Sequence, residues 1–273
     1  MRAGRCRPAA VGIPDCLAAP AGRARGEAMK PHRLEAVTFD CWNTLLRERD
    51  FAVARARRAD ALVRVAAERG VELAPDAAAE ALRAAFERHL ALWRDGVASG
   101  APEMAHWALA SVGVADPALA ARLAPVLEEA SLAGEAEALP GAGDVLDALR
   151  SGGVRLALVC DTGISPGRVV RELLRRAGLL DALEVLVFSN EVGVPKPHRR
   201  MFESALGPLG VAPARAAHVG DLKRTDVHGG RAAGMATVRI RAAFDDPDVL
   251  PDADAVVGAH AELLAALEAL RAG

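Results

Sequence analysis

The chain has 273 residues, of which 52% are hydrophobic and 26% are charged. This length fits one large domain, or one domain that carries an inserted one, and the apolar fraction is sufficient for a sizeable buried core. The 34 Lys and Arg residues nearly balance the 36 Asp and Glu residues, and aromatic residues make up 3% of the chain with no Tyr. Such a composition offers neither a basic field nor a base-stacking surface, so we expect no nucleic-acid partner.

The cysteines and the apolar runs bear on the cellular compartment. The four cysteines, Cys6, Cys16, Cys41 and Cys160, show no CxxC spacing, which argues against a zinc site or a disulfide framework. This usage is typical of a reducing cytoplasm. No stretch reaches the ~18 uninterrupted apolar residues of a membrane span. We therefore expect a cytoplasmic globular protein, monomeric or homodimeric, without a membrane partner.

Residues 1–33 differ from the rest of the chain. They contain seven basic residues, two acidic residues and four prolines, and they show no helical or strand periodicity. They also lack the long apolar segment of a secretory signal. We predict that residues 1–33 form a disordered leader, and Met29, directly before the first regular pattern, is a candidate for the true start.

A helical segment interrupts the chain directly after its first strand. Residues 36–39 form a short apolar, β-prone run that ends at Asp40. Residues 47–139 then show the helical spacing of apolar side chains, most clearly at Leu82, Phe86 and Leu90, with glycines and prolines between the stripes. We predict about four helices in this segment and no strand.

Strands and helices alternate from residue 140 onward. Apolar strands are predicted at 154–159, 184–188, 215–219 and 236–240, with helices between them and a last strand and helix after residue 253. This alternation is typical of a parallel sheet covered by helices on both faces. The predicted fold is α/β, a doubly wound parallel sheet (residues 34–46 and 140–273) with an inserted all-helical domain (residues 47–139). Ligands of such sheets bind at the carboxyl ends of the strands.

Polar residues follow four successive strands of this predicted sheet. They are Asp40 after the first strand, Cys160 to Gly163 after the second, Lys196 between two prolines after the third, and Asp221 and Asp226 after the fourth. Taken singly, such residues are common as helix caps, surface loops and turns. Together they predict one site, because three carboxylates in a crevice repel one another unless a cation such as Mg²⁺ is bound. A carboxylate beside that metal can attack phosphorus, while a lysine and a threonine hydroxyl stabilise the transferred group.

The same residues resemble the motifs of the haloacid dehalogenase superfamily. Phe39 to Leu45 follow its Phe-Asp-x-x-x-Thr-Leu motif, Lys196 is followed by Pro197, and Gly220 to Asp226 follow its Gly-Asp-x-x-x-x-Asp motif. The resemblance covers residues 35 to about 241. It implies a Rossmann-like core, Asp40 as nucleophile, Lys196 as charge stabiliser, and a Mg²⁺ site that includes Asp40, Asp221 and Asp226. The insertion resembles the family's cap, which closes over the site and selects the substrate.

Two motifs depart from the pattern of the superfamily's phosphatases. Trp42 stands where these phosphatases carry a second Asp, their general acid and base, although its backbone carbonyl can still bind the metal. Cys160 and Asp161 stand where Ser-Asn is usual, so we assign the hydroxyl role to Thr162. We include Trp42, Asp161 and Gly163 among the substrate-binding residues.

Three functions remain open at this point. The first is a Mg²⁺-dependent phosphohydrolase that acts through an aspartyl phosphate on a small phosphorylated metabolite, one with a good leaving group because the general acid is missing. The second is a 2-haloacid dehalogenase, because the superfamily's dehalogenases carry an aromatic residue two positions after the nucleophile. The third is a weakly active or non-catalytic phosphate-binding relative. We favour the phosphohydrolase, and His89 and His106 of the insertion are open as further groups that face the site.

Overall fold

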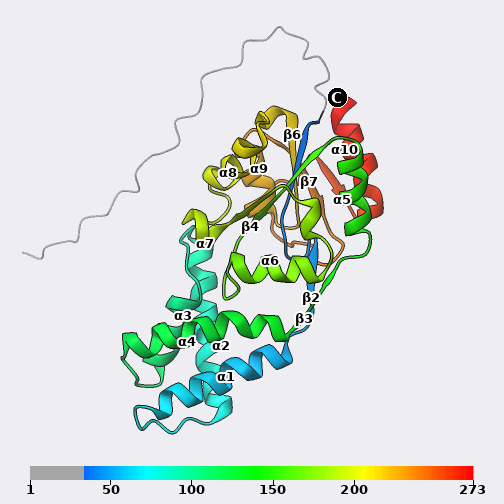
Figure 1. Ribbon diagram of the computed structural model, residues 1–273. Coiled ribbons are helices and arrows are strands. Elements are labelled where there is room, and N and C mark those ends of the chain that lie inside the picture. The colour runs from blue at the N-terminus through cyan, green and yellow to red at the C-terminus, as the bar shows by residue number, and fades with distance from the viewer. Residues whose placement is uncertain (1–33, 273) are drawn as a thin grey trace, which may run out of the picture. The chain divides into compact units, whose positions relative to one another are not determined.

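The structure, a computed structural model, describes residues 34–272 of the chain (Figure 1). The leader predicted for residues 1–33 lies outside the described residues. Six parallel strands form the central sheet, in the order β5-β4-β1-β6-β7-β8. They are β1 (Ala36–Phe39), β4 (Arg155–Cys160), β5 (Val185–Phe188), β6 (Ala216–Gly220), β7 (Ala236–Ile240) and β8 (Ala255–Val257). The predicted doubly wound parallel sheet is confirmed.

The chain order of the strands reverses beside β1. From β1 the chain passes through the insertion to β4 and β5 on one side, and it then returns to β6, β7 and β8 on the other side. In the two ladders, Phe39 of β1 lies opposite Leu158 of β4 and Val219 of β6. A reversal of this kind opens a crevice at the carboxyl ends of the strands. The residues that follow β1, β4 and β6 therefore meet in one place.

Helices cover both faces of the sheet, which explains why its strands are apolar along their length. Val37 and Phe39 share an apolar cluster with α5, α6 and α10, whereas Ala36 of the same strand packs with α8. Figure 1 shows α5 and α10 on one side of the sheet and α8 and α9 on the other. The bounds of these helices are α5 (Ala142–Ser151), α6 (Gly167–Arg176), α8 (Arg199–Leu209), α9 (His228–Ala232) and α10 (Leu263–Ala272). Shorter helical turns are η1 (Ala130–Ala133), η2 (Leu180–Ala182), α7 (Ser189–Val192), η3 (Pro213–Arg215), η4 (Lys223–Val227) and η5 (His260–Glu262).

The insertion contains the four predicted helices. They are α1 (Ala52–Ala67), α2 (Pro75–Arg94), α3 (Ala101–Ser111) and α4 (Pro117–Glu129). Prolines in the first turns of α2, α3 and α4 favour these starts, and the Asp116 carboxylate accepts the N–H groups of Ala118 and Leu119 at the start of α4. The four helices share an apolar cluster that includes Leu62, Met104 and Leu123. Within residues 34–272, no helix combines the length and the apolar character needed to cross a membrane.

The prediction that the insertion contains no strand is wrong. Two short strands, β2 (Leu46–Asp50) and β3 (Glu135–Ala138), lie at its two ends and pair antiparallel. β2 is charged and exposed after Leu46, and β3 is a partly exposed Glu-Ala-Glu-Ala segment, so neither carries the β-branched or aromatic residues that signal a strand. The ion pair between Arg47 and Glu137, with an N···O distance of 2.6 Å, joins partners in this ladder. Cross-strand pairing, invisible to a local pattern, produces these strands.

We predict that Leu123→Ala and Val126→Ala, both on α4, differ strongly in stability. Leu123 is fully buried in the apolar cluster, whereas Val126 is 41% exposed. Leu123→Ala leaves a cavity and should lower the free energy of unfolding by about 2–5 kcal/mol. Val126→Ala should change it by less than about 0.5 kcal/mol. Urea denaturation followed by circular dichroism measures both values, and equal effects would show that the four helices have no packed core.

Candidate active site

Three strand ends place aspartates in the crevice beside β1. Asp40 follows β1, Asp161 follows β4 and Asp221 follows β6. The backbone N–H of Asp40 donates to the carbonyl of Val219 at 2.8 Å, which extends the ladder of β1 and β6 to the site itself. A cavity of about 410 Å³ opens here. The cavity is lined by Asp40, Trp42, Asp161, Thr162, Gly163, Lys196, Asp221 and Asp226 of the predicted site, whereas Cys160 at the end of β4 is fully buried and is not among the lining residues.

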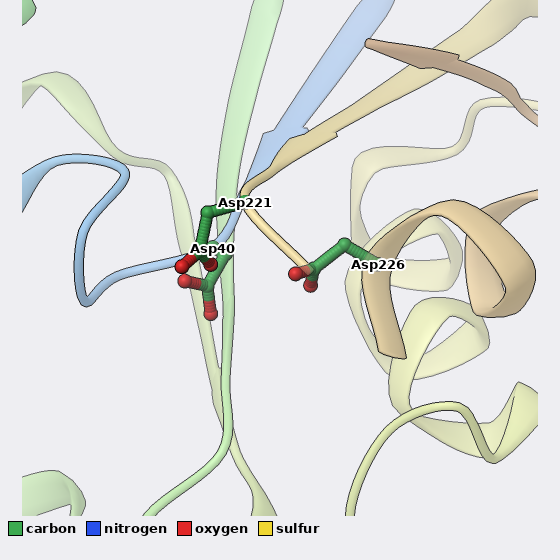
Figure 2. A group of neighbouring side chains, drawn as sticks. All are labelled: Asp40, Asp221 and Asp226. Carbon is green, nitrogen blue, oxygen red and sulfur yellow. The ribbon is translucent and has the colours of Figure 1, made fainter. Parts of the chain in front are cut away.

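A cluster of three carboxylates forms the floor of the site. One oxygen each of Asp40, Asp221 and Asp226 lies within 4.8 Å of the others. Figure 2 shows the side chains of Asp40 and Asp221 next to each other and that of Asp226 pointing toward them from η4. All three residues are buried. The amide of Asn43 donates to Asp221 at 3.3 Å and orients that carboxylate.

A single buried ammonium group connects two of these carboxylates. Lys196 is 1% exposed, and its Nζ donates to Asp40 Oδ1 at 2.6 Å and to Asp226 Oδ1 at 2.7 Å. Burial alone would lower the pKa of Lys196, but the negative charges of Asp226 and Asp40 outweigh burial and raise the pKa above its usual value. The lysine therefore remains charged at the centre of the site.

Asp226 is fixed by protein donors on both of its oxygens. Oδ1 accepts from Lys196 and lies 3.1 Å from His218 Nε2, while Oδ2 accepts the N–H of Leu222 at 3.0 Å. The other ring nitrogen of His218 lies 2.7 Å from the hydroxyl of Thr38 on β1. Burial acts to raise the pKa of Asp226, but the contacts with Lys196 and His218 outweigh it and hold the pKa below its usual range. Asp226 is thus an ionised anchor for Lys196.

The other two carboxylates have the opposite electrostatic environment. Burial raises the pKa of Asp40 to about 7, although Lys196 acts against this shift. Burial, together with the negative charges of Asp40 and Asp226, raises the pKa of Asp221 to about 8. Buried carboxylates that repel one another gain most from a divalent cation, and these oxygen donors are the ligands that Mg²⁺ prefers. The chemistry of the donor set therefore fits a magnesium ion.

The end of β4 adds a second group of polar contacts. Asp161 Oδ1 accepts the backbone N–H of Lys196 at 2.8 Å, so this carboxylate positions the lysine loop. The hydroxyl of Thr162 lies 3.0 Å from Ser189 Oγ and donates to Asn190 Oδ1 at 3.1 Å. Within residues 34–272, no protein acceptor takes the backbone N–H groups of Trp42 and Gly163, and both residues line the cavity. These two N–H groups are available to an anionic ligand.

The insertion supplies the other wall of the cavity, chiefly from α2. Its lining residues on this helix are Phe86, His89, Leu90 and Trp93. Trp93 Nε1 donates to Asp161 Oδ2 at 2.8 Å, and the guanidinium of Arg224 lies 4.1 Å from the centre of the Trp93 ring. Trp93 thus joins α2 to the segment after β4 and to η4 at the carboxyl edge of the sheet.

Sequence reasoning missed most residues of this wall. The apolar stripe of α2 predicts a helix but does not by itself place Phe86, Leu90 or Trp93 at the site; on this helix the sequence leaves only His89 open as a group that faces it. Phe86 is 40% exposed and, like Leu90 and Trp93, lines the cavity. Of the two histidines left open, His89 lines the cavity, whereas His106 is exposed and is not among its lining residues. A histidine within an apolar helical stripe was the available signal for His89.

The fold is a doubly wound parallel sheet, and aspartates and a buried lysine lie at its carboxyl edge. This combination is typical of α/β enzymes whose active site is built around carboxylate groups. The sequence agrees, because the family model of haloacid dehalogenase-like hydrolases matches residues 34–234. The chain therefore belongs to the haloacid dehalogenase-like hydrolase family.

Individual relatives carry phosphatase and hydrolase names. The phosphoserine phosphatase of Thermus thermophilus is 39% identical over 115 residues, which are 41% of this chain and 45% of that protein, so the match spans less than half of that relative. The haloacid dehalogenase-like hydrolase domain-containing protein 3 of Homo sapiens is 30% identical over 214 residues, 75% of this chain and 81% of that protein. Among solved structures, the 2-haloacid dehalogenase from Pseudomonas syringae pv. Tomato DC3000 has a TM-score of 0.60 at 23% identity, covering 86% of this chain and 99% of that one. This last likeness shows the shared fold.

We predict that the stability of the metal-free protein falls with rising pH because of Asp40 and Asp221. Their pKa values in the folded state are about 7 and about 8, so they hold protons that the unfolded chain releases near the ordinary value of 3.8. Between these limits the folded state binds more protons, and the free energy of unfolding decreases as the pH rises. Melting curves from about pH 5 to about pH 8.5 in chelator should show a steeper fall for the wild type than for Asp221→Asn. An equal slope in both proteins would contradict the raised pKa of Asp221.

Proposed function

We propose that this hydrolase is a Mg²⁺-dependent phosphohydrolase that acts on a small phosphorylated metabolite through an aspartyl phosphate at Asp40. The observation that carries the proposal is the contact of Lys196 Nζ with both Asp40 and Asp226, beside Asp221, at the buried floor of the site. A site of this charge distribution favours a reaction in which a dianionic group is transferred to a carboxylate. The relative named phosphoserine phosphatase supports the same reaction class.

The proposed chemistry has two steps. An oxygen of Asp40 attacks phosphorus, the bond to the substrate oxygen breaks, and the aspartyl phosphate forms. Water then attacks the same phosphorus, the bond to Asp40 breaks, and inorganic phosphate leaves. The ammonium of Lys196 offsets the negative charge of the transferred group in both steps.

We assign the residues after β4 and β1 to the binding of the phosphoryl group. The unpaired N–H groups of Trp42 and Gly163 can donate to its oxygens, and the Thr162 hydroxyl can do so by giving up its bond to Asn190. Asp161 gives both oxygens to protein donors, so it contributes by holding the backbone of Lys196.

We propose that Mg²⁺ is held by Asp40, Asp221, Asp226 and the backbone carbonyl of Trp42. The ion, when bound, neutralises charge on the phosphoryl group and on the clustered carboxylates. Asp226 already gives both oxygens to protein donors, whereas Asp221 accepts one hydrogen bond, from Asn43. We therefore expect Asp40 and Asp221 to contribute most to the affinity.

Residues 47–139 serve, in this proposal, as a cap on a core formed by residues 34–46 and 140–273. The cavity has walls from both parts, so a bound substrate contacts α2 as well as the strand ends. Contact with both walls would exclude water and select the substrate. We also propose that the protein works in the cytoplasm as a monomer or homodimer.

We predict that Asp221→Asn abolishes metal-dependent activity and weakens Mg²⁺ binding, while the protein stays folded. Removing one of the buried like charges should also raise the melting temperature of the metal-free protein. Isothermal titration with Mg²⁺ measures the affinity, and Asp144→Asn, an exposed aspartate on α5, is the control. Unchanged Mg²⁺ affinity in Asp221→Asn would contradict the assigned ligand.

Trp42 influences which substrate is expected and favours the dehalogenase as a second candidate function. Its side chain lines the cavity and contacts Phe51 edge to face, with ring centroids 6.4 Å apart. An indole carries no proton for a departing alkoxide, so substrates with good leaving groups, such as acyl or aryl phosphates, should react best. The same aromatic wall favours the dehalogenase reaction as the alternative, because a halide leaves without protonation.

We predict that Trp42→Asp improves the turnover of alkyl phosphates relative to aryl phosphates. The new carboxyl group can protonate the departing oxygen, which should raise alkyl phosphate turnover by ~10–10³-fold if it reaches that oxygen. Trp42→Asn is the matched control, since it removes the indole without adding an acid. The measurement is the ratio of alkyl to aryl phosphate turnover at saturating Mg²⁺.

Other outcomes of these assays point to the remaining functions. An unchanged ratio in a folded Trp42→Asp protein would show that position 42 does not reach the leaving group. Metal-independent release of halide from a 2-haloacid by the wild type would identify a dehalogenase. Binding of phosphate without turnover would identify a non-catalytic relative.

A further inference from the structure

His89 is a buried histidine whose ring reaches from α2 to the loop after β4. Its side chain belongs to the lining of the cavity, and the residue is 6% exposed. A Cβ atom at position 163 would lie only 2.8 Å from His89 Nε2, so Gly163 is needed for this approach. Gly163 follows Thr162 in the loop assigned above to phosphoryl binding. Nε2 therefore lies beside that loop.

Only one of the two ring nitrogens is engaged. Nδ1 lies 2.8 Å from the hydroxyl of Ser99, in the segment between α2 and α3. In the described part of the chain the hydrogen-bond partners of the His89 ring belong to Ser99, and no side chain forms a hydrogen bond with Nε2. When Nδ1 donates its proton to Ser99, the tautomer is fixed with a lone pair on Nε2. The free lone pair then belongs to the nitrogen beside Gly163.

The electrostatic surroundings favour the neutral imidazole. Burial lowers the pKa of His89, and Glu103 of α3, the charged group that acts on it, opposes this shift without cancelling it. The neighbouring Arg88 lies over the ring of Trp107, with its guanidinium carbon 4.4 Å from the ring centre. A neutral imidazole with a free nitrogen can accept a proton near neutral pH.

No other histidine in residues 34–272 combines these properties. His218 has both ring nitrogens within hydrogen-bond distance of Thr38 and Asp226. His106 is exposed and does not line the cavity. Glu48 lines the cavity, but it is an exposed residue. Among the histidines of residues 34–272, His89 is the buried one that lines the cavity and whose Nε2 accepts no hydrogen bond from a side chain.

We propose that His89 is the general base that activates water for hydrolysis of the aspartyl phosphate. Nε2 accepts a proton as the water oxygen bonds to phosphorus, the bond between phosphorus and Asp40 breaks, and Asp40 takes the electron pair. The imidazolium then returns the proton to solvent as phosphate leaves. This inference rests on the proposed function, and it gives the second step a base that Trp42 cannot supply.

The test uses p-nitrophenyl phosphate with the Mg²⁺-loaded full-length protein and its His89→Gln variant. If His89 acts after release of p-nitrophenol, the variant forms the aspartyl phosphate at the normal rate but hydrolyses it slowly. We expect kcat to fall by ~10²-fold. Rapid mixing should show a burst of about one p-nitrophenol per active site before the slow steady state. Intact-mass measurement of the quenched variant should show the phosphorylated chain.

Two further variants separate catalysis from structure. His106→Gln, an exposed histidine of the same insertion, should leave both steps unchanged. His89→Ala should recover part of its turnover on addition of imidazole, which replaces a missing base but not a missing packing contact. If His89→Gln is unstable, His89→Ala with and without imidazole provides the same comparison.

The outcomes distinguish this inference from the function on which it rests. A His89→Gln protein that loses both steps in parallel, with no burst and no imidazole response in His89→Ala, would overturn the role of His89 and leave the phosphohydrolase intact. A wild-type protein without Asp40-dependent phosphate release would reject the phosphohydrolase itself.

Discussion

The buried ammonium group of Lys196 is the contact on which the architecture of the site depends. An isolated charge in a protein interior costs several kcal/mol, and this cost is offset only by well-placed partners. Here the partners come from different elements, Asp40 after β1 and Asp226 in η4, both within 2.7 Å of Nζ. His218 and Thr38 then connect Asp226 back to β1. One charge thus holds together loops that are far apart in the sequence.

The balance of charges explains why the site needs more than this lysine. Asp40, Asp221 and Asp226 share Lys196 as a positively charged neighbour, and of the three carboxyl groups only that of Asp226 has a lowered pKa. The pKa values of Asp40 and Asp221 are raised as a result, to about 7 and about 8. An arrangement that is unfavourable by itself becomes favourable once a cation or a transferred group completes it. The electrostatic frustration of the site is therefore an indication of function.

The central sheet and the floor of the site could be predicted from the sequence because their signals are local. A buried parallel strand must be apolar along its length, and parallel strands put their carboxyl ends at one edge of the sheet. The sequence therefore predicts that Asp40, Lys196 and Asp221 lie close together. The insertion wall could not be predicted in this way. Apolar residues at the same helical spacing on α2 pack into the core at Ala81 and line the cavity at Phe86. Only the tertiary packing decides which of these two environments each residue occupies. The hydrogen bonds between His218 and Thr38 and between Trp93 and Asp161 likewise join residues that lie 180 and 68 positions apart in the sequence.

The pairing of β2 with β3 has a consequence for how this protein can diversify. The chain leaves the core along β2 and comes back along β3, so the two connections of the insertion lie side by side. A segment whose ends are close together can be lengthened, shortened or exchanged without pulling apart the sheet that carries it. Asp40 and Lys196 lie outside that segment, whereas His89 and Trp93 lie within it. The cavity wall that α2 forms can therefore be replaced, by evolution or by design, while the cluster of Asp40, Lys196, Asp221 and Asp226 stays unchanged.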